Sequence, residues 1–87
     1  MKVFKFGAVW CQDCLVMRPI WEDIEKEIEG FESKYFDIDS DLGIEKFNIT
    51  TVPSFLFFDN SGKEFLRLEG LQNRDDLIDI IKKNLNK

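Results

Sequence analysis

The chain has 87 residues, of which 44% are hydrophobic and 33% are charged, and its net charge is −5. This length allows one domain, residues 1–87, with one small core, and the nine Phe residues argue for a packed interior rather than disorder. The negative charge disfavours nucleic acid and anionic membrane surfaces as partners, and no apolar stretch is long enough to span a bilayer. Because His is absent, imidazole general bases and metal sites that need a His ligand are excluded.

The first third of the chain predicts a strand followed by a long helix. Residues 2–9 are rich in Val and Phe and predict the strand. In residues 11–29, apolar side chains recur at three-to-four spacing opposite charged ones, which predicts an amphipathic helix that ends at Gly30. Pro19 removes a backbone donor inside this helix and predicts a kink. Both cysteines therefore lie at the N-terminal end of the helix.

The rest of the chain predicts shorter elements. They are a strand at residues 33–38, a short helix at 42–47 that Asn48 ends, strands at 54–58 and 64–68, and a helix that Asn73 caps. The turn signal at residues 59–62 predicts that the last two strands form an antiparallel hairpin. The whole order predicts an α/β domain in which the first two strands are parallel and the two long helices cover the sheet.

Only Gln12 and Asp13 separate the two cysteines. A disulfide across so short a loop stabilises the fold by roughly 2 kcal/mol in the chain-entropy model, against about 4.7 kcal/mol for a 100-residue loop, so redox turnover explains the pair better. A helix N-terminus stabilises a thiolate through its free N–H groups and its dipole, which predicts Cys11 as the attacking thiol. Cys14 lies nearly one turn further on and is predicted to resolve the mixed disulfide.

Two other interpretations of the cysteine pair stay open at this point. The pair could form a structural disulfide, or it could supply half of a metal or iron–sulfur site, which would require a dimer to complete four ligands. The position of the pair at the start of a helix, directly after a strand, favours the redox interpretation.

Four landmarks resemble the thioredoxin family and occur in the same order. Residues 6–14 are similar to the family's active-site segment, and Pro19 stands where the family has its helix-kinking proline. Residues 46–53 resemble the stretch that leads into the family's cis-proline, here Pro53, and Gly70 matches the glycine of its substrate groove. The resemblance covers nearly the whole chain, although the N-terminal strand and helix of full thioredoxins have no counterpart, so the architecture is closer in size to glutaredoxin.

This resemblance implies a thioredoxin-like fold with a minimal core, in which a four-stranded mixed sheet of order 2-1-3-4 is flanked by helices. It implies a thiol–disulfide oxidoreductase that accepts electrons from a reductase and reduces protein disulfides through Cys11 and Cys14, with no bound cofactor and no metal. We expect a monomer in the cytoplasm. The residues implied in substrate binding are Trp10, Val52, Pro53 and Gly70.

Departures from the family pattern are expected to tune the redox potential. Gln12 and Asp13 replace the Gly-Pro between the cysteines. Lys5 aligns with the aspartate that thioredoxins bury below the resolving cysteine, and Tyr35 aligns with the lysine partner of that aspartate. A carboxylate opposes ionisation of a nearby thiol whereas an ammonium favours it, so Asp13 and Lys5 are expected to act in opposite directions, with Asp13 the stronger.

Some of these residues also have a purely structural interpretation. Lys5 could be a solvated charge on a strand, and Trp10 could be a partly buried core residue rather than a substrate contact. For the whole protein, the competing function is a binding module, namely a redox-inert or metal-bridging domain of the same fold that binds extended peptides beside Pro53. Turnover with a dithiol donor would separate the two functions.

Overall fold

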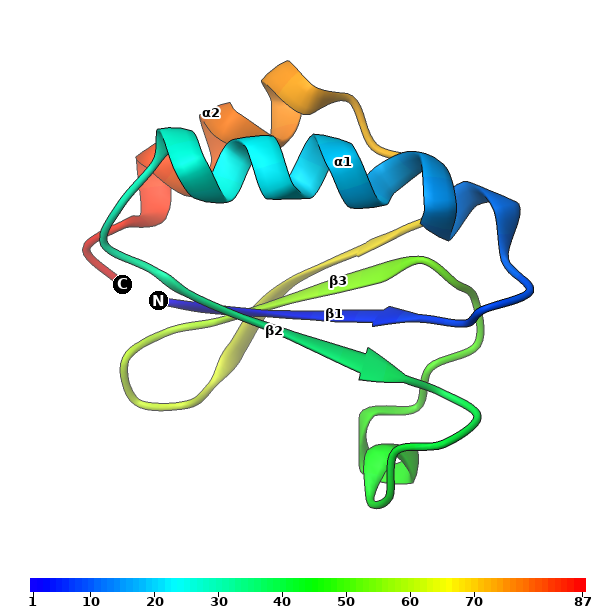
Figure 1. The fold of residues 1–87 in the computed structure, drawn as a ribbon. Coiled ribbons are helices and arrows are strands. Elements are labelled where there is room, and N and C mark those ends of the chain that lie inside the picture. The colour runs from blue at the N-terminus through cyan, green and yellow to red at the C-terminus, as the bar shows by residue number, and fades with distance from the viewer.

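The computed structural model describes residues 1 to 87 and confirms the predicted order of elements (Figure 1). The elements are the strands β1 (Lys2–Gly7), β2 (Glu32–Asp37), β3 (Ser54–Phe58) and β4 (Glu64–Glu69), the helices α1 (Gln12–Glu27) and α2 (Arg74–Asn84), and the short 3-10 helix η1 (Ile44–Phe47). The sheet order is β2-β1-β3-β4, with β1 parallel to β2 and with β3 antiparallel to β1 and β4. The predicted mixed sheet is therefore confirmed. Neither α1 nor α2 combines the length and apolar character of a membrane span.

Three elements have a boundary two residues from the predicted one, each for a local reason, while the bounds of β2 and β4 differ by one residue. β1 ends at Gly7 because the chain turns directly after it. The Cys11 N–H donates a 3.2 Å hydrogen bond to the Ala8 carbonyl oxygen and closes this turn. α1 is shorter than predicted at both ends, since Cys11 is its N-cap and Ile28 already has extended backbone dihedral angles. The short helix expected before Asn48 is only a 3-10 turn, because Gly43 adopts a left-handed φ of 79°.

The main core lies between the sheet and the two long helices, which cover the same face of the sheet (Figure 1). The Trp21 ring of α1 stacks on Phe55 of β3 with a centroid separation of 5.4 Å. Each large apolar side chain that is fully buried in this way contributes on the order of 1.5–3 kcal/mol of transfer free energy. The other residues fully buried in this layer are Val3, Ile24, Phe57, Leu77 and Ile81.

The opposite face of the sheet, here called the open face, carries a cluster of aromatic side chains. The members of this aromatic cluster are Phe4, Phe6, Phe36, Phe47 and Phe58. Phe6 is fully buried and its ring stacks on Phe36 at 5.2 Å, whereas Phe4 and Phe36 are only half-buried. The one helical element that packs here is η1, which contributes Phe47 to the cluster and places Ile44 against it.

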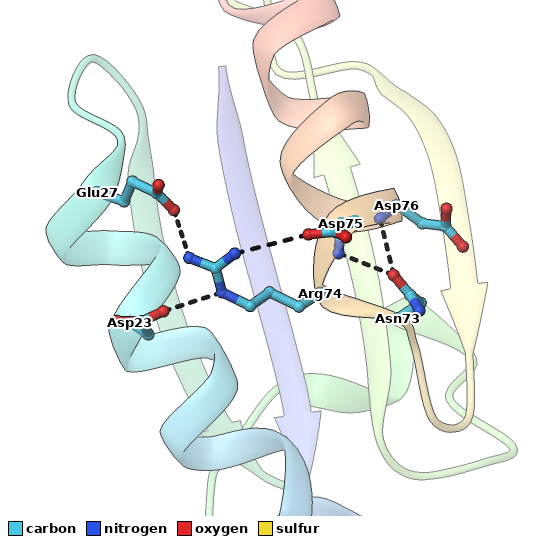
Figure 2. Close-up of polar contacts among 6 residues, drawn as sticks. All are labelled: Asp23, Glu27, Asn73, Arg74, Asp75 and Asp76. Carbon is cyan, nitrogen blue, oxygen red and sulfur yellow. Dashed lines mark hydrogen bonds and ion pairs between the residues drawn. The ribbon is translucent and has the colours of Figure 1, made fainter.

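Polar contacts tie α2 to α1 at the surface (Figure 2). The Arg74 guanidinium, at the first residue of α2, donates to Asp23 at 2.9 Å and to Glu27 at 2.5 Å, both on α1. One residue earlier, the Asn73 side chain caps α2 by accepting the N–H of Asp75 at 2.8 Å. The predicted cap at Asn73 is confirmed.

Alternation along β1 sends its residues to different layers. Phe4 and Phe6 join the aromatic cluster of the open face. Lys5 instead points under α1, where its ammonium lies 3.9 Å from Glu25 and 5.4 Å from the centroid of the Trp21 ring. β1 therefore delivers a cation to the helix-covered layer and leads through Gly7 directly into the turn that holds the first cysteine.

Candidate active site

Cys11 and Cys14 meet at the N-terminal end of α1 as free, buried thiols. Cys11 is the N-cap of the helix, with φ −87° and ψ 111°, and its sulfur accepts the backbone N–H of Cys14 at 3.1 Å. The Cys11 thiol also faces the carbonyl oxygen of Val52 at 3.7 Å. The sulfur of Cys11 therefore receives the N–H group that an N-cap oxygen would otherwise receive, which is the position where a negative charge is most favoured on a helix.

Cys14 lies in a different electrostatic environment. Burial, and secondly the hydrogen bond with the Cys11 side chain, raise the pKa of its thiol to about 11. The backbone N–H of Ala8 opposes this effect, and the charge of Asp13 adds a smaller upward contribution. Cys14 therefore stays protonated at neutral pH until its surroundings change during a reaction.

Exposed large apolar side chains flank the two cysteines in the chain, and another follows Gly70. They are Val9, Trp10, Leu15, Val16 and Leu71. The Trp10 side chain is 63% exposed, and its indole N–H donates to Asp39 at 2.7 Å, which holds the ring beside the cysteines. The interpretation of Trp10 as a partly buried core residue is therefore wrong, while its role in substrate contact stays a prediction.

Residues from the β3 end of the sheet complete the surroundings of the thiols. The Val52-Pro53 peptide bond is cis, as the family resemblance implied, and the Val52 side chain packs against Cys11 and Cys14. Gly70 adopts a left-handed φ of 84°, and its N–H donates to the Pro53 carbonyl at 2.8 Å. The structure thus links Gly70 to Pro53 and places Val52 directly at the thiols.

Lys5 and Asp13 occupy opposite kinds of environment. The Lys5 side chain is 19% exposed, and burial lowers its pKa despite the nearby Glu25 and Glu22 carboxylates, which raise it. Asp13 is exposed in the first turn of α1, as is its neighbour Gln12. The interpretation of Lys5 as a freely solvated strand charge is therefore wrong, while the tuning roles of these residues stay predictions.

Tyr35 is a residue of this site to which the sequence analysis assigned no role. It is the register partner of Lys5 in the parallel pair β1–β2, and both residues line a cavity of about 380 Å³ together with Cys14. The pairing register was the available signal, because it places position 35 beside position 5 once the parallel pair is accepted. No cluster of three or more His, Cys, Asp or Glu side chains that could hold a metal occurs in the structure.

Two thiols at a strand-to-helix turn, one capping the helix and one buried behind it, define the dithiol site of a thiol–disulfide oxidoreductase. The family model described as Thioredoxin matches residues 1–83. The chain belongs to the thioredoxin family, which confirms the resemblance seen in its sequence.

Individual relatives agree with this assignment. A thioredoxin of Chlamydia trachomatis is 32% identical over 80 residues, which span 91% of this chain and 78% of the relative. Thioredoxin-2 of Dictyostelium discoideum is 36% identical over 63 residues, or 70% of each chain. The structure of Fasciola hepatica thioredoxin superposes with a TM-score of 0.85 at 32% identity, over 95% of this chain and 79% of that one. These relatives support thiol–disulfide oxidoreductase activity.

Proposed function

We propose that this protein reduces disulfide bonds of other proteins, with Cys11 as the attacking thiol and Cys14 as the resolving thiol. The observation that carries this assignment is the contrast between the two sulfurs. The Cys11 sulfur accepts a helix-terminal N–H at 3.1 Å, whereas burial raises the pKa of Cys14 to about 11. Cys11 is therefore the thiol that is prepared to react as a thiolate.

The exchange has two steps that balance in sulfur, electrons and protons. The Cys11 thiolate attacks one sulfur of a substrate disulfide, forms a mixed disulfide and releases the other sulfur as a thiolate. The Cys14 thiol then loses its proton to solvent and attacks the Cys11 sulfur, which forms the Cys11–Cys14 disulfide and releases the second substrate thiolate. The protein is oxidised by two electrons, and a reductase as electron donor returns it to the dithiol form.

We infer that substrates bind across Trp10, Val52, Pro53 and Gly70. The exposed face of Trp10 supplies apolar contact area next to the thiols. Pro53 has no N–H, and the Val52 carbonyl lies 3.7 Å from the Cys11 thiol, where an extended substrate segment could pair with the backbone.

We further propose that the protein is a monomer in the cytoplasm, which sedimentation and cell fractionation would test. Both cysteines of the chain belong to the reactive pair, so no cysteine is left for a separate structural disulfide. This supports a reducing compartment, because structural disulfides are typical of oxidising ones.

Trapping of the mixed disulfide tests the division of labour between the thiols. In Cys14→Ser, a protein disulfide should accumulate as an adduct on Cys11, whereas the matched variant Cys11→Ser should form no such adduct at neutral pH. Turnover of a protein disulfide with a dithiol donor should be lost in both variants. Limiting alkylation of the reduced protein that labels mainly Cys14, read by mass spectrometry, would contradict the assignment.

The thioredoxin relatives do not favour the competing binding module. A redox-inert or metal-bridging domain would bind peptides without turnover, so the turnover assay with a dithiol donor separates the two functions.

We also infer that Gln12, Asp13 and Lys5 set the reduction potential, because Asp13 raises the pKa of Cys14 and Lys5 places a cation in the adjoining cavity.

A further inference from the structure

The space beside Gly7 is filled from two sides. A Cβ atom on Gly7 would lie 2.8 Å from the hydroxyl oxygen of Tyr35 and 3.2 Å from the sulfur of Cys14. Real Cβ atoms make almost no contacts as short as the first of these, so the absence of a side chain at Gly7 is what lets the hydroxyl and the sulfur approach the same point. The phenol of β2 and the thiol of α1 thus border the same point beside the last residue of β1.

Charged and titratable groups approach this pair from all of the elements packed around it. They are Lys5 from β1, Cys11, Asp13, Arg18, Glu22 and Glu25 from the α1 segment, and Asp37 from β2. The ammonium of Lys5 lies 3.9 Å from Glu25, so its charge is partly neutralised within the cavity. None of these groups lies among the atoms nearest to a Cβ on Gly7, where the Tyr35 hydroxyl and the Cys14 sulfur do.

The Tyr35 hydroxyl keeps its proton and can donate a hydrogen bond, whereas the Cys14 thiolate would be stabilised by accepting one. Burial, and then the charges of Asp37 and Cys14, raise the pKa of Tyr35, so its hydroxyl keeps its proton at neutral pH. Burial raises the pKa of Cys14 to about 11. Cys14 must nevertheless become a thiolate after Cys11 has entered a mixed disulfide, and a hydrogen bond to a charged sulfur lowers the free energy of that state.

We propose that the Tyr35 hydroxyl donates a hydrogen bond to the Cys14 sulfur as this sulfur becomes a thiolate, and that it thereby accelerates the resolving step. This role rests on the proposed assignment of Cys14 as the resolving thiol. The Cys14 proton leaves to solvent, the Cys14–Cys11 bond forms as the bond from Cys11 to the substrate sulfur breaks, and the substrate sulfur departs with the electron pair. Tyr35 keeps its own proton throughout.

Stopped-flow reaction with dithiobis-nitrobenzoate, which releases a coloured thiolate in each step, tests this role. The first release reports attack by Cys11 and the second reports attack by Cys14. In Tyr35→Phe we expect the first release to stay within about twofold of the unsubstituted protein and the second to slow about tenfold at neutral pH, since a hydrogen bond to a charged group is worth about one pKa unit or more. The pH profile of the second release should move to higher pH by about one unit.

Ser33→Ala is the matched control, because it removes another hydroxyl from the same face of β2, where Ser33 accepts the Trp21 indole N–H at 2.8 Å away from the thiols. It should leave both releases unchanged. Equal slowing of the second release in Ser33→Ala, slowing of both releases together in Tyr35→Phe, or an unshifted pH profile would overturn the role of Tyr35.

A second variant keeps the test decisive if Tyr35→Phe does not fold. Gly7→Ala retains the phenol but places a methyl group 2.8 Å from the hydroxyl oxygen and 3.2 Å from the Cys14 sulfur, so one of these groups must move away and the second release should slow selectively as well. A Gly7→Ala protein with an unchanged second release would refute the contact. If the unsubstituted protein gives no first release at all, the proposed function fails instead, which is a different outcome from a normal first release followed by a Tyr35-independent second one.

Discussion

The two faces of the sheet are covered by different elements and bury different kinds of side chains. On the open face, the aromatic cluster is closed only by the short η1 segment, and its outer members Phe4 and Phe36 stay half-buried. On the helix-covered face, fully buried apolar residues surround a cation, Lys5, and the cavity that leads to Cys14. This difference shows that the helix-covered layer, and not the open face, accommodates a partly buried charge in the cavity that Cys14 also lines.

The largest expected effect is on stability and separates the two faces directly. Phe57 is fully buried under the helices, so Phe57→Ala should lower the free energy of unfolding by about 3–5 kcal/mol. Phe4→Ala, on the half-buried side of the open face, should cost clearly less, because part of its surface is already in water. Urea unfolding of both variants measures this. Equal losses would mean that the two faces are packed equally well.

The next effect concerns the buried cation. Because burial lowers the pKa of Lys5, the unfolded chain holds this proton more tightly than the folded protein does. The free energy of unfolding therefore gains a contribution that rises with pH, from the lowered pKa up to the ordinary value of 10.5. Lys5→Met removes the burial cost and should stabilise the protein at neutral pH by about 1 kcal/mol.

The comparison with Lys5→Met has to be made as a difference between the two proteins at each pH. Cys14 and Tyr35 have raised pKa values and contribute the opposite slope at alkaline pH, but both are present in each protein and cancel. The difference in urea midpoint should shrink as the pH approaches 10.5. A difference that is independent of pH would show that Lys5 is solvated in the folded protein after all.

A smaller effect contrasts the buried cation with an exposed anion. Asp13 opposes a negative charge on Cys14, so Asp13→Asn should shift the reduction potential to less negative values by roughly 10–20 mV. Lys5→Met should shift it in the other direction. Equilibration with glutathione measures both potentials, and Asp76→Asn, which removes an exposed carboxylate from the first turn of α2 instead of α1, serves as the matched control. A more negative potential in Asp13→Asn would reverse the proposed sign.

The smallest expected effect is at the surface clamp that joins the covering helices. Arg74→Met removes the contacts to Asp23 and Glu27 shown in Figure 2, and it should lower the urea midpoint slightly, less than any substitution above, because exposed ion pairs are screened by water. Added salt should reduce the difference from the unsubstituted protein. Lys83→Met, which breaks an exposed pair within α2, is the matched control. A loss that persists at high salt would indicate packing rather than charge.

Much of this fold is legible in the sequence because local signals agree with tertiary structure. Periodicity identified both long helices, and the turn at residues 59–62 identified the hairpin. Asn48, predicted to end the short helix, has a left-handed φ of 53°, whereas α1 ends at Glu27, three residues before Gly30. The cysteine pair was placed correctly at the start of α1, since a strand and an amphipathic run flank it. Where the conformational preference of a single residue decides the local backbone, the sequence is enough to predict the element.

What the sequence left undecided depends on neighbours that are distant in the chain. The environment of Lys5 is created by Trp21 and Glu25 of α1, and the position of the Tyr35 hydroxyl by the β1–β2 register and the missing side chain at Gly7. The short helix before Asn48 was predicted too long, because the left-handed Gly43 leaves room for only one 3-10 turn. Such contacts follow from packing, which no local pattern encodes.

The two tryptophans give this protein a pair of intrinsic fluorophores in opposite surroundings. Trp21 is 2% exposed and stacks on Phe55, so its emission should be blue-shifted and should report unfolding of the helix-covered layer. Trp10 is largely in water beside the thiols, so its emission should lie to the red and should respond to oxidation of Cys11, because a nearby disulfide quenches an excited indole. A single emission spectrum can therefore follow folding at one wavelength and redox state at another, without any attached label.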